Sequence, residues 1–356
     1  MRVSDENGVE WLLLAGQRHK TLRGLTHVLV NRCVEAGIAI SRLNLGVFAV
    51  HPEMAGYAVH WKDGFDEPIE FPVRHEDTLT PEYLDSPIKL LVDTGEPLHF
   101  DLADPHAGEQ FPVIEEFRSQ GMTDYRGFAI PCGESGDAVL TLCTQRQGGF
   151  LESEIVWFTR LFPALSLLVD LMETRRLAKT VLTTYLGRHT GKLVLEGKIR
   201  RGQGESIEAA LWLCDLRGFT AMTNELGSTA MIDVMNLYFD CIAEAIWNEG
   251  GEILKFMGDA ILVVFRITDG CSAGQACVQA NRAAQAAQQR LSALSEQRRR
   301  DGLCPLHAGI ALHLGEVIYG NIGAKSRLDF TVMGNAVNFV SRLQSITADL
   351  AEPVLF

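Results

Sequence analysis

The chain has 356 residues, of which 47% are hydrophobic and 22% are charged, as is ordinary for a globular protein of two or three domains. Its formal net charge of −13, with no compensating basic stretch, argues against nucleic acid or a membrane surface as partners. The eight cysteines lack CxxC spacing, which favours free thiols in a reducing compartment. Because neither a signal-peptide pattern nor an apolar run of about 18 residues is present, we expect a cytoplasmic protein without a transmembrane helix.

Residues 1–150 predict a first domain in which helix and strand patterns alternate. An amphipathic helix is predicted over residues 11–32, with core candidates at Leu14, Leu22, Leu25, Val28 and Leu29. Strands are predicted at 43–50, 56–61, 98–101, 125–131 and 138–144, and short helices at 86–94 and 112–119. Turns are expected at His51-Pro52 and at 133–137. The stretch 63–87 is rich in proline and acidic residues, and no strand is predicted there.

The order of these elements over residues 11–172 is similar to that of GAF-like sensor domains of the α/β class. That resemblance leaves two alternatives, a domain that binds a small-molecule ligand and a domain that only dimerises. The lone histidines of this region, such as His60 and His99, are expected to be structural or solvated residues.

Residues 151–204 predict a helical connector. Apolar side chains recur in a heptad-like pattern along a helix that begins after Phe150, and Pro163 is expected to kink or restart it. The pattern consists of Ile155, Phe158, Phe162, Leu165, Val169 and Met172. Two interpretations stay open: a parallel dimer helix that transmits changes in the sensor, or one helix packed on its own domain.

The C-terminal region, residues 205–356, contains two short acidic motifs. Asp215 ends an apolar run of strand length, and a glycine turn and a helix pattern follow it. Asp259 lies with Gly258 in a predicted hairpin turn between two apolar runs. A lone aspartate at such a position is more often a turn or cap residue. Two carboxylates at strand ends, however, are a usual way to hold a divalent cation for phosphate chemistry.

Other polar residues accompany the two aspartates. Successive backbone N–H groups over residues 217–220 form a candidate phosphate cradle. Lys255 lies in an otherwise apolar strand, where a charged side chain needs a reason. In a helix that follows Gly334, Asn338 and Arg342 would be one turn apart on the same face. The opposite, apolar face would consist of Phe339, Leu343 and Ile346.

The remaining elements predict an α+β sandwich of the ferredoxin-like type. A helix with a core stripe is predicted over residues 231–245, a second helix over 272–300 and a strand over 306–314. Arg298, Arg299 and Arg300 are expected to lie on a solvated helix end. The order strand, helix, hairpin, helix, strand would place Asp215 and Asp259 on adjacent central strands.

The segments CDLRGFTAMT, GGEILKFMGDAILVVF and HAGIALHLGEVIYGNIGAKSRLDFTVMGNAVNFVSRL resemble, in this order, class III nucleotide cyclases. The resemblance covers residues 205–356 and implies two bound ions per site, Mg²⁺ or Mn²⁺. It assigns roles to ten positions: metal binding to Asp215, Asp259 and the Leu216 carbonyl, phosphate binding to Gly218, Phe219 and Thr220, purine recognition to Lys255 and Thr331, ribose orientation to Asn338, and charge stabilisation to Arg342.

The purine residues favour ATP over GTP. A lysine donor suits the N1 acceptor of adenine, and Thr331 can accept the adenine amino hydrogen. A guanine site would instead place a glutamate at position 255. The Lys/Thr pair resembles an adenylate cyclase subgroup for which bicarbonate stimulation is a further hypothesis. A guanylate cyclase and a catalytically weak, nucleotide-binding regulatory dimer remain the alternatives.

The same resemblance implies a homodimer, because the sites of this family form between two cyclase domains. Residues 182–200 resemble the transducer segment that precedes cyclase domains in many signalling proteins. Family members continue into a further hairpin, which carries a lysine that contacts the triphosphate. The sequence ends at Phe356, so the resemblance implies either a shortened chain or a weaker hold on the phosphates.

Overall fold

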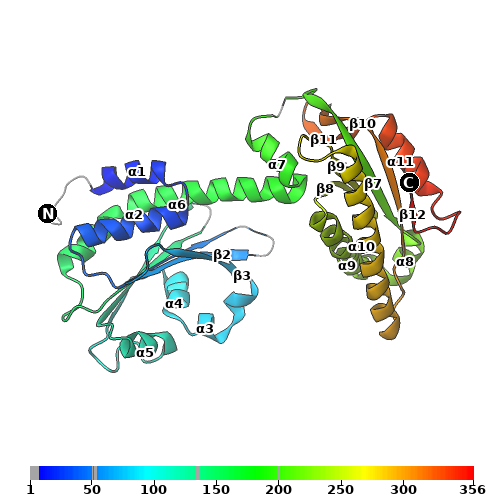
Figure 1. The fold of residues 1–356 in the computed structure, drawn as a ribbon. Helices are drawn as coiled ribbons and strands as arrows, with labels where there is room; N and C mark the ends of the chain where they lie inside the picture. Colours follow the sequence, from blue (N-terminus) through cyan, green and yellow to red (C-terminus); the bar gives the residue numbers. More distant parts are fainter. Residues whose placement is uncertain (1–7, 50, 52–53, 134–135, 199) are drawn as a thin grey trace. The chain divides into compact units, whose positions relative to one another are not determined.

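The structure is a computed structural model that describes residues 8–49, 51, 54–133, 136–198 and 200–356. It contains two compact units, residues 1–180 and 181–356, and each has its own β-sheet (Figure 1). The predicted turns at His51-Pro52 and 133–137 lie partly outside the described residues.

The N-terminal unit contains a six-stranded antiparallel sheet in the order β3-β2-β1-β6-β5-β4. Its strands are β1 (Arg42–Phe48), β2 (Met54–Lys62), β3 (Ile69–Arg74), β4 (Leu98–Asp101), β5 (Asp124–Ile130) and β6 (Ala138–Thr144). The five predicted strands are present. The sixth strand, β3, was missed within the stretch 63–87. It is an edge strand that contains Pro72, and an edge strand tolerates the missing N–H of proline.

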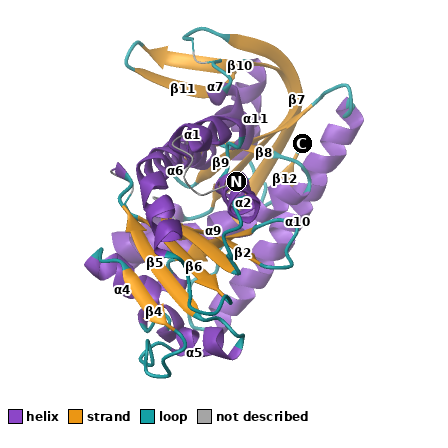
Figure 2. Ribbon diagram, turned by 90° about the vertical axis from the view of Figure 1, so that its left-hand side faces the viewer, coloured by secondary structure: helices purple, strands orange, loops and turns teal. Residues whose placement is uncertain are grey.

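Helices cover both faces of this sheet (Figure 2). On one face lie α1 (Gly8–Arg18), α2 (Leu22–Glu35) and α6 (Glu152–Leu186), which share one apolar core with β1, β2, β5 and β6. Short helices follow β3 and β4: η1 (Glu76–Leu79), α3 (Pro81–Leu84), α4 (Pro87–Thr94) and α5 (Pro112–Ser119). The predicted helices 86–94 and 112–119 are therefore confirmed.

The helix predicted over residues 11–32 is wrong in one respect, because it is two helices. The hydroxyl of Thr21 accepts a hydrogen bond from the backbone N–H of Gly24 at 3.1 Å, so a new helix starts there. Leu22, Leu25 and Leu29 are buried as predicted, whereas Leu14 is 54% exposed. The break changes the phase of the helical pattern, and the core position of the first helix is Leu12 instead.

The heptad-like residues of α6 pack into the core of the N-terminal unit. Phe158, Leu165 and Val169 are at most 1% exposed and belong to the same cluster as the strands. These residues therefore pack on the helix's own domain, as one of the two interpretations expects, and they do not form a dimer seam. A role of α6 in a dimer stays a prediction. Pro163 does not end the helix. Among the described residues α6 alone is long and apolar enough to cross a membrane, and 44% of its most apolar window is buried within the unit.

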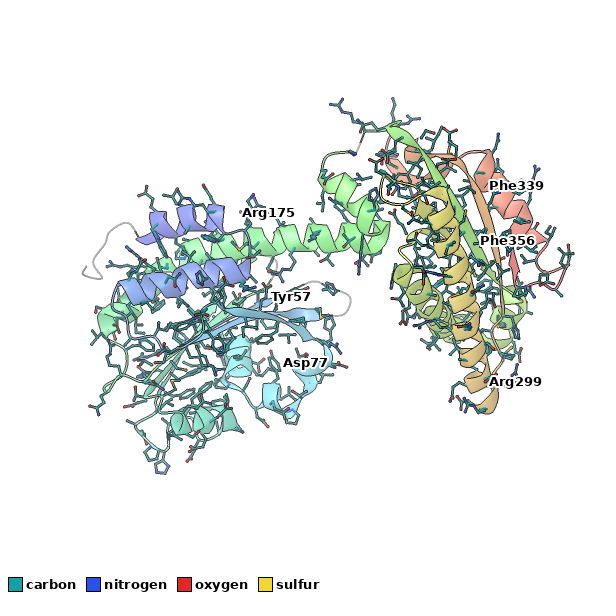
Figure 3. The ribbon with its side chains drawn as sticks, viewed as in Figure 1. Tyr57, Asp77, Arg175, Arg299, Phe339 and Phe356 are labelled. Carbon is teal, nitrogen blue, oxygen red and sulfur yellow. The ribbon has the colours of Figure 1, made fainter. Side chains whose placement is uncertain are left out.

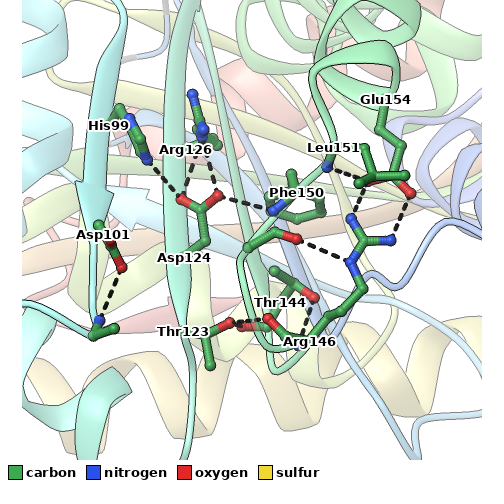
Figure 4. A network of polar contacts seen from close by, with 12 residues as sticks. His99, Asp101, Thr123, Asp124, Arg126, Thr144, Arg146, Phe150, Leu151 and Glu154 are labelled. Atoms are coloured by element: carbon green, nitrogen blue, oxygen red, sulfur yellow. Dashed lines mark hydrogen bonds and ion pairs between the residues drawn. The ribbon is translucent and has the colours of Figure 1, made fainter.

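A polar network fixes the start of α6 to the sheet (Figure 4). The carboxylate of Asp124, on β5, accepts hydrogen bonds from the backbone N–H of Phe150 at 3.0 Å and from Arg126 Nε at 3.2 Å. Glu154, in the first turn of α6, is buried and paired with Arg146. It also accepts the backbone N–H of Leu151 at 2.8 Å. These buried charges are paired, which is the condition for their burial.

The C-terminal unit has a second sheet in the order β11-β10-β7-β9-β8. Its strands are β7 (Gly204–Leu216), β8 (Glu252–Met257), β9 (Ala260–Arg266), β10 (Ala308–Ala324) and β11 (Arg327–Met333), with β12 (Val354–Leu355) paired in parallel to β10. The helices are α7 (Arg188–Leu195), α8 (Phe219–Leu226), α9 (Ser228–Asn248), α10 (Ala273–Arg300) and α11 (Asn335–Ser345). The long strand β10 turns into β11 as a hairpin (Figure 2).

The side chains of β7 alternate between two apolar cores, one on each face of the sheet. Ala210, Trp212 and Cys214 face a core formed with α9 and α10. Ala209, Leu211 and Leu213 face the opposite core, which includes residues of α7 and α11. Since side chains alternate between the faces of a strand, Asp215 continues the second series and lies on the α11 side of the sheet.

Two expectations for the helices of this unit are wrong in part. Arg299 and Arg300 are exposed at the end of α10 as expected, and Arg298 is not. Arg298 is only 6% exposed, because its Nε donates to the carbonyl of Cys304 at 2.8 Å and its stem packs under the loop that follows α10. Of the face of α11 expected to be apolar, Leu343 is half-buried and packs against the core with Ala336 and Val340, whereas Phe339 and Ile346 are 53% and 41% exposed (Figure 3). The small side chain of Ala336 lies against Gly315 of β10, so α11 approaches the sheet closely there.

Candidate active site

The two acidic motifs meet at one end of the sheet. Asp215 is the penultimate residue of β7, and Asp259 lies in the two-residue turn between β8 and β9. Strand β9 pairs with β7 from Cys214 opposite Ile261, and this pairing brings the turn beside Asp215. Gly258 has φ +65°, which the tight turn requires and which glycine adopts without strain. The structure therefore brings together the two aspartates predicted from the sequence.

The pKa of Asp215 reflects the proximity of Asp259. Burial raises the pKa of Asp215 to about 6, and the charge of Asp259 and a hydrogen bond with it act in the same direction. The Leu216 N–H and the Gln344 side chain donate to Asp215 and lower its pKa. The two neighbouring carboxylates form an anionic pair that a divalent cation would neutralise. The residues present thus fit the metal ions that the resemblance implies.

Beneath the aspartates lies a buried polar pair. Cys214 Sγ is 3.1 Å from the hydroxyl of Tyr238 on α9, and both side chains are fully buried. Burial raises the pKa of the Cys214 thiol to about 12, so this cysteine is neutral at physiological pH. Tyr238 belongs to the core stripe predicted over residues 231–245, but its contact with Cys214 was not predicted, because the two residues are 24 positions apart. The buried side chains next to the two carboxylates are therefore neutral and add no charge to the site.

The segment after Asp215 differs in part from the predicted phosphate cradle. Arg217 donates its backbone N–H to the His307 carbonyl at 2.7 Å, and its guanidinium donates to the carbonyls of Thr347 and Glu352, both at 2.8 Å. Its backbone N–H is therefore engaged within the domain. Helix α8 begins immediately after Gly218, which is left-handed with φ +76° and provides no side-chain cap.

The N-terminus of α8 is the part of this segment that remains suited to anions. The first-turn N–H groups of a helix have no partners within the helix, and the helix dipole favours negative charge there. Phe219 and Thr220 are the first two residues of α8, and Thr220 is exposed. Leu216 is buried at the end of β7 next to Asp215. A phosphate group held beside the two aspartates would lie within reach of these residues.

The predicted purine residues lie on the two outer strands of the five-stranded path. Lys255 is on β8, and its ammonium forms an ion pair with Asp329 on β11. Thr331 is half-buried, two residues farther along β11, and pairs with Gly320 of β10. Asp329 was not among the predicted site residues. A carboxylate two positions before Thr331 was visible in the sequence, but nothing local indicated that it contacts Lys255.

The other two predicted residues lie on the surface of α11. Asn338 and Arg342 are exposed and one turn apart, as the helical pattern predicts. Within the part of the chain that the structure describes, neither side chain has a hydrogen bond or an ion pair. A residue of the same helix, Gln344, contacts Asp215 instead. The structure thus confirms the shared helix face, and it does not join Asn338 or Arg342 to the carboxylates of the same chain.

Helix α7 is joined to this sheet by a second network. The hydroxyl of Thr190 is 2.7 Å from that of Tyr319 on β10, which donates to the carboxylate of Glu252 on β8 at 3.1 Å. His189 contacts Arg266, whose guanidinium lies 4.6 Å above the ring of Tyr319. Part of the segment 182–200 is therefore packed against the sheet that carries the aspartates.

The N-terminal unit has a recess of ≈ 180 Å³ against its sheet. Small or apolar residues of β1, β2, β3 and β6 form most of its wall, and Asn44, Thr78 and Tyr83 add polar groups. Burial raises the pKa of Tyr83, so its hydroxyl is protonated and can donate a hydrogen bond. Sequence reasoning did not locate this recess.

Comparison with known proteins identifies the C-terminal unit. Residues 204–351 match the family model described as the adenylate and guanylate cyclase catalytic domain. An adenylate cyclase of Anabaena cylindrica is 35% identical over 153 residues, which cover 42% of this chain and 29% of that protein. Adenylate cyclase 1 of Rhizobium meliloti (strain 1021) is 30% identical over 150 residues, covering 42% of this chain and 22% of that protein. The chain thus spans less than a third of either relative.

Solved structures also match the chain in part. The adenylyl cyclase CyaB from P. aeruginosa is 32% identical, with a TM-score of 0.37 and coverage of 40% of this chain and 74% of that one. The guanylyl cyclase Cya2 is 36% identical, with a TM-score of 0.35 and coverage of 40% and 71%. On the family model and the sequence identities to the curated relatives, residues 204–351 belong to the adenylate and guanylate cyclase catalytic domains.

Proposed function

We propose that this protein is an adenylate cyclase that converts ATP to 3′,5′-cyclic AMP and pyrophosphate at the interface of a homodimer. The observation that carries the proposal is the paired carboxylates of Asp215 and Asp259, which lie within a matched cyclase catalytic domain. In the reaction the ribose 3′-oxygen forms a bond to the α-phosphorus, and the bond from the α-phosphorus to the α,β-bridging oxygen breaks. Pyrophosphate leaves with that oxygen, and the proton of the 3′-hydroxyl passes to solvent.

Asp215, Asp259 and the carbonyl of Leu216 would hold the two divalent cations, Mg²⁺ or Mn²⁺. When bound, these ions supply charge neutralisation for the phosphates and acidify the attacking hydroxyl. Among the described residues no three His, Cys, Asp or Glu side chains come together as a metal site. Water and phosphate oxygens would therefore complete the coordination, as is usual for Mg²⁺ with nucleotides.

The remaining residues of the site bind and orient ATP. The first turn of α8, at Phe219 and Thr220, would receive the phosphates, and Gly218 leaves room for them because no Cβ projects there. Asn338 would orient the ribose by hydrogen bonds. Arg342 would offset the charge that develops on the pentavalent phosphate, an electrostatic contribution typically of about 3–4 kcal/mol.

The exposed positions of Asn338 and Arg342 support a composite site. Neither side chain reaches the carboxylates of its own chain through a described contact, and both are available on the surface of α11. In a two-fold symmetric dimer each chain would supply metal and purine residues to one site and Asn338 and Arg342 to the other. Two equivalent sites would result.

Lys255 and Thr331 support ATP as the substrate. The ammonium of Lys255 can only donate, which matches the ring-nitrogen acceptor N1 of adenine and opposes the N1–H of guanine. The hydroxyl of Thr331 would accept the adenine amino hydrogen. For the N-terminal unit we infer a sensor role, in which the recess beside Asn44 and Tyr83 is the candidate site of a small-molecule ligand.

The test is an assay of the full chain with Mg²⁺ or Mn²⁺ and either ATP or GTP, in which cyclic product is quantified beside Asp259→Asn. We expect cyclic AMP from the unchanged protein and at least about 100-fold less from the variant. Cyclic GMP as the main product would overturn the choice of substrate. If neither nucleotide is cyclised, the enzyme proposal fails and a nucleotide-binding dimer takes its place.

Mixing two inactive variants tests the shared site. Asp259→Asn lacks a metal ligand, and Arg342→Ala lacks the residue that the partner supplies. If subunits exchange freely, half of the dimers combine the two variants and each has one intact site. We then expect about a quarter of the activity of the unchanged protein. No recovery, despite exchange verified with two affinity tags, would contradict the composite site.

A further inference from the structure

An ion pair joins the two outer strands β8 and β11. Lys255 on β8 contacts Asp329 on β11, and these strands lie at opposite ends of the path β11-β10-β7-β9-β8. The two side chains are 41% and 48% exposed, so the pair is at the surface and accessible to a ligand. Within the sheet itself the two residues are separated by three intervening strands, and only the β10–β11 hairpin brings them together.

The position of Asp329 connects it to the purine site. Asp329 and Thr331 are two residues apart on β11, so they lie on the same face of that strand. The carboxylate of Asp329 is therefore two residues from Thr331 on β11 and contacts the ammonium of Lys255 on β8. We propose that Asp329 is a positioning residue that holds the Lys255 ammonium for adenine recognition. This inference rests on the proposed function.

The chemistry of a lysine explains why a partner is useful. The ammonium is a point charge on a flexible four-carbon stem, and fixing that stem when a ligand binds costs conformational entropy. A carboxylate that already holds the ammonium reduces this cost before ATP arrives. The ammonium has three N–H donors, so it can keep the contact with Asp329 and still donate to N1 of adenine.

The same contact bears on nucleotide choice. The ammonium of Lys255 has N–H donors and no acceptor. Facing the N1–H of guanine, a fixed ammonium would leave two donors opposed, which costs more than a missing contact. A lysine released from Asp329 could swing away from guanine into water. Loss of Asp329 would therefore weaken ATP recognition and lower the preference for ATP over GTP.

The experiment measures steady-state kinetics of the full chain with ATP and with GTP. For Asp329→Asn we expect the KM for ATP to rise about 3- to 10-fold while kcat stays within about two-fold, because a binding contact is lost and the reacting groups are unchanged. The ratio of kcat/KM for ATP to that for GTP should fall. Asp329→Glu, which keeps a carboxylate, should recover part of the ATP affinity.

A double-mutant cycle separates positioning from a general effect. If Asp329 acts through the lysine, Asp329→Asn should change the KM by less than about two-fold in a Lys255→Ala background. The matched control is Glu244→Gln, which breaks the exposed ion pair between Arg290 on α10 and Glu244 on α9. We expect no change in KM for that variant. An equal effect of Asp329→Asn with and without Lys255 would overturn the inference.

A second outcome also overturns it. If Asp329 instead withholds the ammonium from ATP, Asp329→Asn would lower the KM. Calorimetric titration with 3′-deoxy-ATP, which cannot cyclise, gives the affinity independently of turnover and should show the same 3- to 10-fold loss. Cyclic AMP production with an unchanged KM in Asp329→Asn would refute this inference alone. An unchanged protein that neither cyclises nor binds ATP would refute the proposed function and this inference with it.

Discussion

The hydroxyl of Thr190, on helix α7, lies 2.7 Å from the hydroxyl of Tyr319 in the middle of strand β10. Tyr319 is 1% exposed and donates in turn to the carboxylate of Glu252 at 3.1 Å. Glu252 begins β8, the strand that carries Lys255 three residues later. A helix from the segment before the catalytic domain is thus hydrogen-bonded to the strand that we propose reads the purine.

We expect Tyr319→Phe to lower the unfolding free energy of the C-terminal unit by about 1–3 kcal/mol, because Thr190 and Glu252 lose a partner in a buried place. Thr190→Val should have a similar effect, and the double variant should cost less than the sum of the two single changes. Urea unfolding measures these energies. Tyr185→Phe, at a tyrosine that is 78% exposed, is the control and should change nothing. Strictly additive costs would show that the two hydroxyls do not interact.

The site could be predicted from the sequence where its residues belong to short, local motifs. Asp215 and Asp259 end or join apolar runs, so strand pairing alone brings them together. Asn338 and Arg342 follow from one helical turn. In contrast, Asp329 and Gln344 meet Lys255 and Asp215 only because a hairpin and a helix fold back onto the sheet. No spacing in the sequence encodes such a contact.

The fold of the N-terminal unit shows the same limit. Strand and helix positions followed from apolar patterns and turn residues. The pattern along α6 identified a buried face correctly, but a heptad-like seam has the same spacing whether it faces a second chain or its own domain. The three-dimensional packing decides between these partners, and here it is the sheet of the same unit.

This packing predicts how substitutions in α6 behave. Phe158 is fully buried, and Phe158→Ala should destabilise the N-terminal unit by about 3–5 kcal/mol through lost burial and a cavity. Leu167, on the same helix, is 65% exposed, and Leu167→Ala should change stability by less than about 0.5 kcal/mol. Chemical denaturation compares the two variants. Dimer dissociation by Phe158→Ala with unchanged stability of the unit would restore the dimer-seam interpretation.

His60 predicts a pH dependence of the same unit. Burial lowers its pKa from 6.5 to about 4, and the charges of Arg42 and Lys62 act in the same direction. Between these values the unfolded chain binds a proton that the folded chain does not, so stability falls as the pH drops from 6.5 to 4. His60→Asn should flatten this slope, as measured by thermal unfolding at several pH values. His19→Asn, at an exposed position, should leave it unchanged.

Asp215 predicts the opposite pH dependence in the metal-free C-terminal unit. Its folded pKa of about 6 lies above the ordinary value of 3.8, so the folded chain binds the proton more tightly. Stability from this group is present at low pH and is lost as the pH rises from 3.8 to 6. With metal chelated at pH 8, Asp215→Asn should therefore raise the thermal midpoint of this unit, by roughly 2–4 °C for each kcal/mol gained.

The increase in thermal midpoint caused by Asp215→Asn should become smaller as the pH is lowered from 8 toward 3.8. Asp215 is then protonated in the folded chain, so it is neutral like the asparagine. Added Mg²⁺ should stabilise the unchanged protein at pH 8, since the ion offsets the repulsion between the two carboxylates, and should leave Asp215→Asn nearly unaffected. Asp269→Asn, at an exposed aspartate of the same unit, is the matched control and should keep the full response to Mg²⁺. A Mg²⁺ shift of the same size in Asp215→Asn would place the cation elsewhere.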